Sequence, residues 1–244
     1  METIFISSNK NTGPIQLIGE GEDLSDVSIA SILDLYKRHG LIWFRNFKTD
    51  VELFEEFSQS FTEKFLVFPQ ASDVRKALNS DGSLKTVDLS PRPIPLHSEM
   101  AYMPEGLKPE IAWFYCASAS DGSGATTAAD GAELANLLRD SSKYDSLLSK
   151  DILYTQEWDM DRWRQFTGAE TVDELDEWIK SKGYFDVMKI DSEGVLHLSR
   201  ISPLLTKPKF QEQSVFVNTT LHQNYRSERS VPVSYTHRTL PTKA

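Results

Sequence analysis

The residues best suited to chemistry in this sequence are a histidine and a glutamate two positions apart. His97 and Glu99 stand in the proline-bounded segment PIPLHSEMAYMP. In an extended segment, positions i and i+2 project to the same side, so an imidazole nitrogen and a carboxylate oxygen could face one ion. Two histidines and one carboxylate on one face form a common non-haem iron(II) site. The competing interpretation is a surface loop, because about 0.7 such His-x-acid matches are expected by chance at this composition.

A second candidate is the small-residue segment GSGATTAADG, which follows an apolar run. Such a loop leaves backbone N–H groups and the hydroxyls of Thr126 and Thr127 available to bind a carboxylate. An ordinary turn is the alternative for this segment taken alone.

Composition narrows the class of protein. The chain has 244 residues, 39% of them hydrophobic, and a formal net charge of -10. This charge argues against a general nucleic-acid binder and against a polybasic membrane surface. We find no apolar run near the roughly 20 residues of a membrane-spanning helix, and no signal-peptide pattern. The single cysteine, Cys116, excludes an internal disulfide and favours a cytoplasmic location.

Periodicity and turn signals predict the elements that would position these residues. Helices are expected over 25–39, 50–61, 130–138, 161–166 and 171–183, and strands over 41–47, 110–119, 152–158 and 214–221. Residues 77–90 are expected to be irregular. Strands interspersed with helices, without regular βαβ spacing, indicate an α+β fold with a β-rich core.

Five segments, in order, resemble the TauD/TfdA-like superfamily of Fe(II)- and 2-oxoglutarate-dependent dioxygenases, in particular its SyrP-like and asparagine-oxygenase-like branch. They are HGLIWFRNF, IPLHSEMAYMP, PEIAWFYCASASDGSGATTAADG, WDMDRWRQFTGAETVDELDEW and SVFVNTTLHQ. In the first, Asn46 replaces the family's usual glycine. The resemblance implies a double-stranded β-helix, the jelly roll of clavaminate-synthase-like enzymes, with flanking helices.

The resemblance also implies roles for individual residues. His97 and Glu99 would be two of three iron ligands, and Thr126 would bind a carboxylate of 2-oxoglutarate. Asp130 would cap a helix. Tyr102 would line the substrate pocket or belong to the core, and Asn218 would lie near the pocket or be a strand-end amide.

The implied reaction is hydroxylation of a C–H bond of a small amino-acid-like substrate, free or carrier-bound. It consumes O₂ and 2-oxoglutarate and releases succinate and CO₂. Glu99 occupies the position at which related halogenases carry a small residue, which favours hydroxylation. A carrier protein is a candidate partner, and neither nucleic acid nor a membrane is expected.

The family's distal histidine and its 2-oxoglutarate-binding arginine have no counterpart that we can find. His197 comes too early in the order, His222 matches a position that is not a ligand, and His39 is expected to face solvent. His237 lies in a tail, VPVSYTHRTLPTKA, that does not resemble the family. We therefore expect a partial dioxygenase domain over 1–232, incomplete at its C-terminus and inactive as a fragment, with a non-native tail over 233–244. The alternatives are a degenerate jelly roll without catalytic iron and, with less support, a zinc hydrolase.

Overall fold

The chain divides into two compact units, each of which is described by itself. A computed structural model describes residues 2–5, 13–66, 75–87, 94–103, 108–119, 126–182, 187–210, 212–219 and 238–239. The first unit comprises Met1–Leu66, Ile111–Asp130 and Lys209–Gln211. The second comprises Val67–Glu110, Gly131–Pro208 and Glu212–Ala244.

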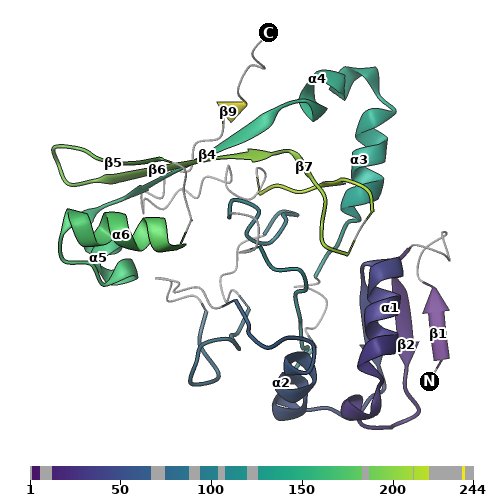
Figure 1. Cartoon of the computed structure of the whole chain (residues 1–244). Helices are drawn as coiled ribbons and strands as arrows, with labels where there is room; N and C mark the ends of the chain where they lie inside the picture. Colours follow the sequence, from purple (N-terminus) through teal and green to yellow (C-terminus); the bar gives the residue numbers. More distant parts are fainter. Residues whose placement is uncertain are drawn as a thin grey trace. The chain divides into compact units, whose positions relative to one another are not determined.

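The first unit is a small sheet with helices (Figure 1). Its strands run in the order β1 (Glu2–Phe5), β2 (Ile15–Ile18), β3 (Ile42–Arg45). Strands β2 and β3 are parallel, so a crossover must join them, and α1 (Ile29–His39) lies within that connection. The 3₁₀ turn η1 (Leu24–Asp26) precedes α1, and α2 (Val51–Gln59) follows β3. The core of this unit contains Ile15, Leu17, Leu24, Ile32 and Phe57.

Helix α1 confirms the helix predicted over 25–39, with a later start. Ser28 caps its N-terminus by accepting from Ser31 N, and Gly40 ends it in the left-handed conformation at φ 68°. The expectation that His39 faces solvent is wrong. His39 is 6% exposed, and its Nδ1 lies 2.8 Å from the carbonyl oxygen of Gly13. The last turn of α1 lies beside the start of β2, so this histidine is a structural residue of the first unit.

The strand predicted over 110–119 is also wrong for the described residues 108–119, which form no strand. The apolar run that suggested it does alternate in burial: Trp113 and Tyr115 are half-buried, whereas Phe114 is 69% exposed. Trp113 packs against Phe57, and Tyr115 stacks on Phe54 with ring centroids 5.4 Å apart. Packing of the side chains therefore explains why burial alternates over residues 113–115, although the described residues 108–119 form no strand.

The second unit is built on a sheet of order β5 (Val187–Ile190), β6 (Leu196–Pro203), β4 (Asp151–Trp158), β9 (Arg238–Thr239), and all its pairs are antiparallel. Strand β4 confirms the strand predicted over 152–158. Strands β7 (Leu205–Thr206) and β8 (Val215–Phe216) form a separate antiparallel pair. Of the strand predicted over 214–221, the described residues contain only β8.

The predicted helices of this unit are confirmed. They are α3 (Gly131–Arg139), α5 (Met160–Thr167) and α6 (Val172–Lys182); η2 (Ser142–Tyr144) and α4 (Asp145–Leu148) follow α3. Helix α6 begins with a reciprocal capping box, since Thr171 Oγ1 accepts from Glu174 N and Glu174 Oε2 accepts from Thr171 N, both at 3.3 Å.

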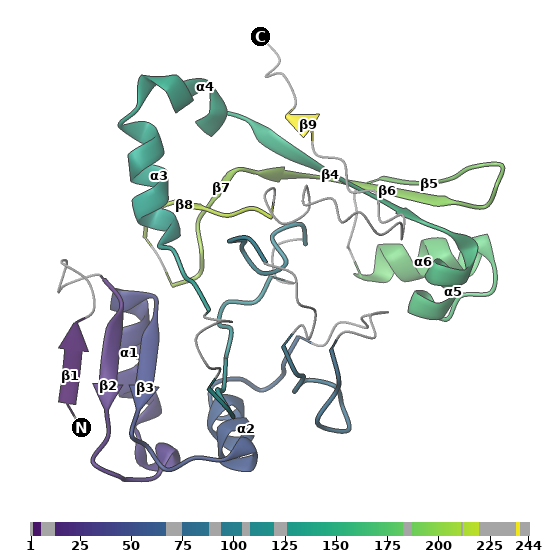
Figure 2. The same ribbon diagram turned by 180° about the vertical axis from the view of Figure 1, so that it is seen from behind.

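Different partners cover the two halves of the inner face of the β4–β6 sheet (Figure 2). Toward Trp158, helices α5 and α6 cover it with Trp163, Leu175 and Ile179. Toward Tyr154, it is covered by Tyr102 of the segment that holds His97, and by groups that include Leu204 and Phe216. The sheet thereby positions the candidate site.

The mixture of helices and small sheets agrees with the predicted α+β class. The double-stranded β-helix stays a prediction, and so does the boundary at 232/233. Among the helices that the structure describes, none has the length and apolar character needed to cross a bilayer.

Candidate metal centre

His97 and Glu99 approach each other in the second unit. His97 Nε2 lies 3.8 Å from Glu99 Oε2, and the two side chains are 22% and 45% exposed. The expected extended geometry is wrong, because residues 94–98 have no regular structure and residues 99–102 form a turn. The convergence of the pair therefore results from a turn and not from the pleat of a strand.

That turn is tight and rests on buried neighbours. Met100 has a left-handed backbone at φ 53°, which is uncommon for a residue other than glycine. Ala101 N donates to Ser98 O at 3.4 Å, and Met103 N donates to Met100 O at 2.8 Å. Ala101 and Met103 are 1% and 2% exposed. Their burial holds the backbone that brings Glu99 back toward His97.

The imidazole of His97 is oriented on both sides. Its Nδ1 lies 2.8 Å from Pro95 O, and because a carbonyl oxygen only accepts, the ring donates there. In the neutral tautomer this leaves the lone pair on Nε2, the atom nearest Glu99. In the metal-free protein, the hydrogen bond with Glu99 raises the pKa of His97 above its usual value, and partial burial opposes this shift. The pair is therefore a basic site that attracts a proton or a cation.

A backbone hydrogen bond connects this segment to the end of β8. Ser98 N donates to Asn218 O at 2.9 Å, and Asn218 is buried. Tyr102 is half-buried and packs edge-to-face on Tyr154 of β4, with ring centroids 6.3 Å apart. Tyr102 and Asn218, the two residues named as pocket candidates, therefore lie on or beside the segment that holds His97 and Glu99.

The remaining candidates belong to the first unit, make other contacts or lie outside the described residues. Thr126 and Thr127 are exposed residues of the first unit, and the assignment of Thr126 to 2-oxoglutarate stays a prediction. Asp130 directly precedes α3, as expected for a residue that caps this helix. His197 contacts carboxylates, with Nε2 2.9 Å from Asp191 Oδ2 and Nδ1 3.4 Å from Glu157 Oε1. His222 and His237 lie outside the described residues.

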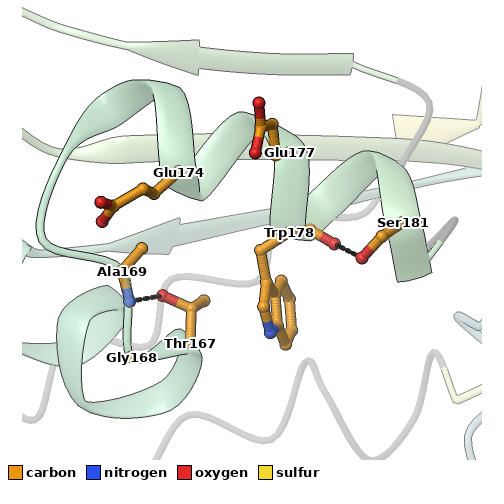
Figure 3. A pocket seen from close by; sticks show the side chains of 7 residues that line it. All are labelled: Thr167, Gly168, Ala169, Glu174, Glu177, Trp178 and Ser181. Carbon is orange, nitrogen blue, oxygen red and sulfur yellow. Dashed lines mark hydrogen bonds between the residues drawn. The ribbon is translucent and has the colours of Figure 1, made fainter.

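A shallow hollow at the junction of α5 and α6 is separate from this pair (Figure 3). It is lined by Thr167, Gly168, Ala169, Glu174, Glu177, Trp178 and Ser181. None of the predicted site residues is among them, and Glu174 is already engaged by the backbone of the capping box. We therefore assign no catalytic role to this hollow.

The geometry of His97 and Glu99 fits two ligands of one divalent ion. Two atoms that each lie about 2.1 Å from an ion can be at most about 4.2 Å apart, and Nε2 and Oε2 satisfy this limit. Imidazole and carboxylate also suit a non-haem iron(II) site. Within the described parts of the chain, no group of three or more His, Cys, Asp or Glu side chains could hold a metal ion. The pair is thus a partial donor set.

Comparison with known families decides the class of this chain. The model of the taurine catabolism dioxygenase TauD, TfdA family matches residues 14–239. The chain belongs to this family. Members of the TauD, TfdA family are dioxygenases that use Fe(II) and 2-oxoglutarate. A search of curated proteins found no match.

Three residues near His97 and Glu99 were not predicted as site residues from the sequence of this TauD, TfdA family member. Tyr154, Arg200 and Thr219 lie on or beside the half of the β4–β6 sheet that Tyr102 covers. Tyr154 and Arg200 become neighbours only through the pairing of β4 with β6. A strand predicted over 196–203 could have suggested this pairing, but the polar residues of this segment and Pro203 make it a weak strand candidate.

Proposed function

We propose that this protein is an Fe(II)- and 2-oxoglutarate-dependent oxygenase that hydroxylates a C–H bond of a small amino-acid-like substrate, free or carrier-bound. The observation that carries the proposal is the 3.8 Å approach of His97 Nε2 to Glu99 Oε2 in a chain of the TauD, TfdA family. When bound, iron would supply the oxidative chemistry that couples decarboxylation of 2-oxoglutarate to hydroxylation.

The protein's own contribution is to hold the donors in place. The Pro95 carbonyl fixes the ring of His97 so that Nε2 points toward Glu99, and hydrogen bonds of this kind to the other ring nitrogen set the orientation of metal-binding histidines. Neutral His97 and ionised Glu99 are the protonation states that bind a divalent ion, so ion binding would release the proton that Glu99 helps to retain. Thr126 is the proposed partner of a 2-oxoglutarate carboxylate.

The first experiment measures metal binding on the chain itself, without turnover. Mn(II) binding is followed by electron paramagnetic resonance in wild type, His97→Ala, Glu99→Ala and the matched control His197→Ala. We expect at least about a tenfold loss of affinity in the first two variants, because each removes one donor, and little change in the control. Equal affinity in all four proteins would remove His97 and Glu99 from the metal site.

The second experiment measures turnover on the longest protein that the source gene encodes, because the resemblance also implies a distal histidine and an arginine for catalysis. Formation of succinate from 2-oxoglutarate with Fe(II) should depend on His97 and Glu99. Metal binding without any succinate, in a protein that carries a distal histidine and an arginine, would instead favour the degenerate jelly-roll alternative.

A further inference from the structure

A tyrosine and an arginine face each other on the inner side of the β4–β6 sheet. Tyr154 of β4 is directly opposite Arg200 of β6 in the antiparallel register, and opposed residues project to the same face. Tyr154 is 1% exposed. Arg200 is half-buried, and its Nε atom is fully buried. A guanidinium therefore extends along the same buried face as a phenolic hydroxyl.

Thr219 adds a second hydroxyl to this face. It is 2% exposed, and its Oγ1 makes no hydrogen bond of normal geometry within the described residues. The hydroxyl lies beside Tyr154: burial raises the pKa of Tyr154, and the side chain and backbone of Thr219 partly oppose this shift. A buried hydroxyl without a partner costs about 1–3 kcal/mol, so its presence calls for an explanation.

This cluster of Tyr154, Arg200 and Thr219 is next to the metal pair in the second unit. Thr219 follows Asn218, whose carbonyl accepts from Ser98 N, and Ser98 lies between the two metal-pair residues. Tyr154 also contacts Tyr102 of the same segment. A ligand held by the cluster would therefore be held close to the reacting centre.

The chemistry of the cluster selects an anion with two oxygens. A guanidinium offers paired N–H donors that match a carboxylate, and hydroxyls can donate to the same oxygens. We propose that Arg200, Tyr154 and Thr219 form the subsite that binds the carboxylate of the amino-acid-like substrate. This inference rests on the proposed function, which makes the amino-acid-like ligand a substrate, but binding of the ligand itself requires no iron.

The test is ligand binding to the metal-free chain by saturation-transfer NMR, followed by calorimetric titration of the ligands that bind. The probes are the twenty protein amino acids, the carboxamide of each amino acid that binds, and 2-oxoglutarate. The variants are Arg200→Gln, Arg200→Lys, Tyr154→Phe and Thr219→Val. Arg45→Gln, an exposed position of the first unit, is the control with the same change of charge.

We expect at least one amino acid to bind and its carboxamide to bind at least about tenfold more weakly, a loss of the size attributed to a charged hydrogen bond. Arg200→Gln should cause a similar loss, Arg200→Lys should restore part of it, and Arg45→Gln should have no effect. Tyr154→Phe and Thr219→Val should each weaken binding several-fold. Thermal unfolding identifies any variant that fails to fold, in which case the carboxamide comparison decides.

Three results would overturn the proposal: no binding by any of the amino acids, equal binding of acid and amide, or a loss confined to 2-oxoglutarate. The last would assign the subsite to the co-substrate. Because no iron and no turnover enter the measurement, a failure of the oxygenase proposal would appear in the Mn(II) and succinate experiments and not in this one.

Discussion

The backbone amide of Ser98 donates a 2.9 Å hydrogen bond to the carbonyl oxygen of Asn218. Ser98 is the residue between His97 and Glu99, and Asn218 follows β8. The backbone between His97 and Glu99 is therefore held by the residues that follow β8.

Replacing Ser98 by proline should uncouple the segment from β8. Proline lacks the N–H and restricts the backbone of the preceding residue, His97. We expect a loss of about 1–3 kcal/mol in the free energy of unfolding, measured by urea denaturation, and weaker Mn(II) binding. Ser98→Ala keeps the amide and is the matched control. Equal stability of the two variants would show that this hydrogen bond contributes little.

A second prediction concerns acid stability around His197. The hydrogen bond from His197 is the largest cause that lowers the pKa of Asp191, followed by the backbone N–H of Val195. A carboxylate with a lowered folded-state pKa contributes stability above its unfolded pKa near 3.8, and this stability is lost as pH falls through the folded value. Wild type should therefore exceed His197→Ala in Tm at pH 5, and the difference should shrink toward pH 3.

The control for this prediction is Glu193→Gln, which removes a neighbouring charge but keeps the backbone N–H that Glu193 donates to Asp191. Carbon-13 NMR of the Asp191 carboxyl should show its pKa rising toward the usual value in His197→Ala. An unchanged pKa would mean that the backbone donors alone hold this carboxylate.

The start of α3 provides a third prediction. A Cβ added at Gly131 would lie 2.8 Å from the carbonyl oxygen of Phe216 in β8. Gly131→Ala should therefore displace β8 or the helix and cost about 1–2 kcal/mol of stability, despite the better helix propensity of alanine. Leu137→Ala, at a position of the same helix that is 67% exposed, should have a much smaller effect. A stabilised Gly131→Ala variant would contradict the close packing of α3 on β8.

His39 gives a prediction that separates structural from metal-binding histidines. His39→Leu would leave the Gly13 carbonyl without its donor in a buried place and should cost about 1–3 kcal/mol. His39→Asn can donate from a similar position and should lose less. Differential scanning calorimetry measures both effects, and Mn(II) affinity should be unchanged in either variant. Loss of metal affinity in both would assign His39 a role that its burial does not suggest.

The sequence predicted best those elements whose causes are local. Capping residues and turn glycines act within one helical turn, so the end of α1 at Gly40 and the capping box at Thr171 and Glu174 can be predicted from neighbouring positions, whereas α1 starts after Ser28 and not at the predicted residue 25. Strands depend on partners that are remote in sequence. The apolar run around Trp113 therefore predicted a strand, whereas the described residues 108–119 form none and Trp113 packs on Phe57.

The candidate site shows the same division. The types and spacing of His97 and Glu99 predicted that these two side chains face each other, and they do, but their approach depends on a turn that the sequence did not indicate. Their role as metal ligands stays a prediction. Arg200 becomes a neighbour of Tyr154 only through strand pairing. No local pattern could have predicted that cluster.

The left-handed backbone at Met100 has a consequence for how the ion would be captured. This backbone conformation is uncommon outside glycine. It persists here because Ala101 and Met103, which follow Met100 in the chain, are buried in the interior. If His97 and Glu99 bind an ion as proposed, the backbone that carries them would be ordered before the ion binds, and less conformational entropy would be lost on coordination. It follows that interior substitutions at Met103 should alter the affinity for the ion while leaving both donors chemically intact.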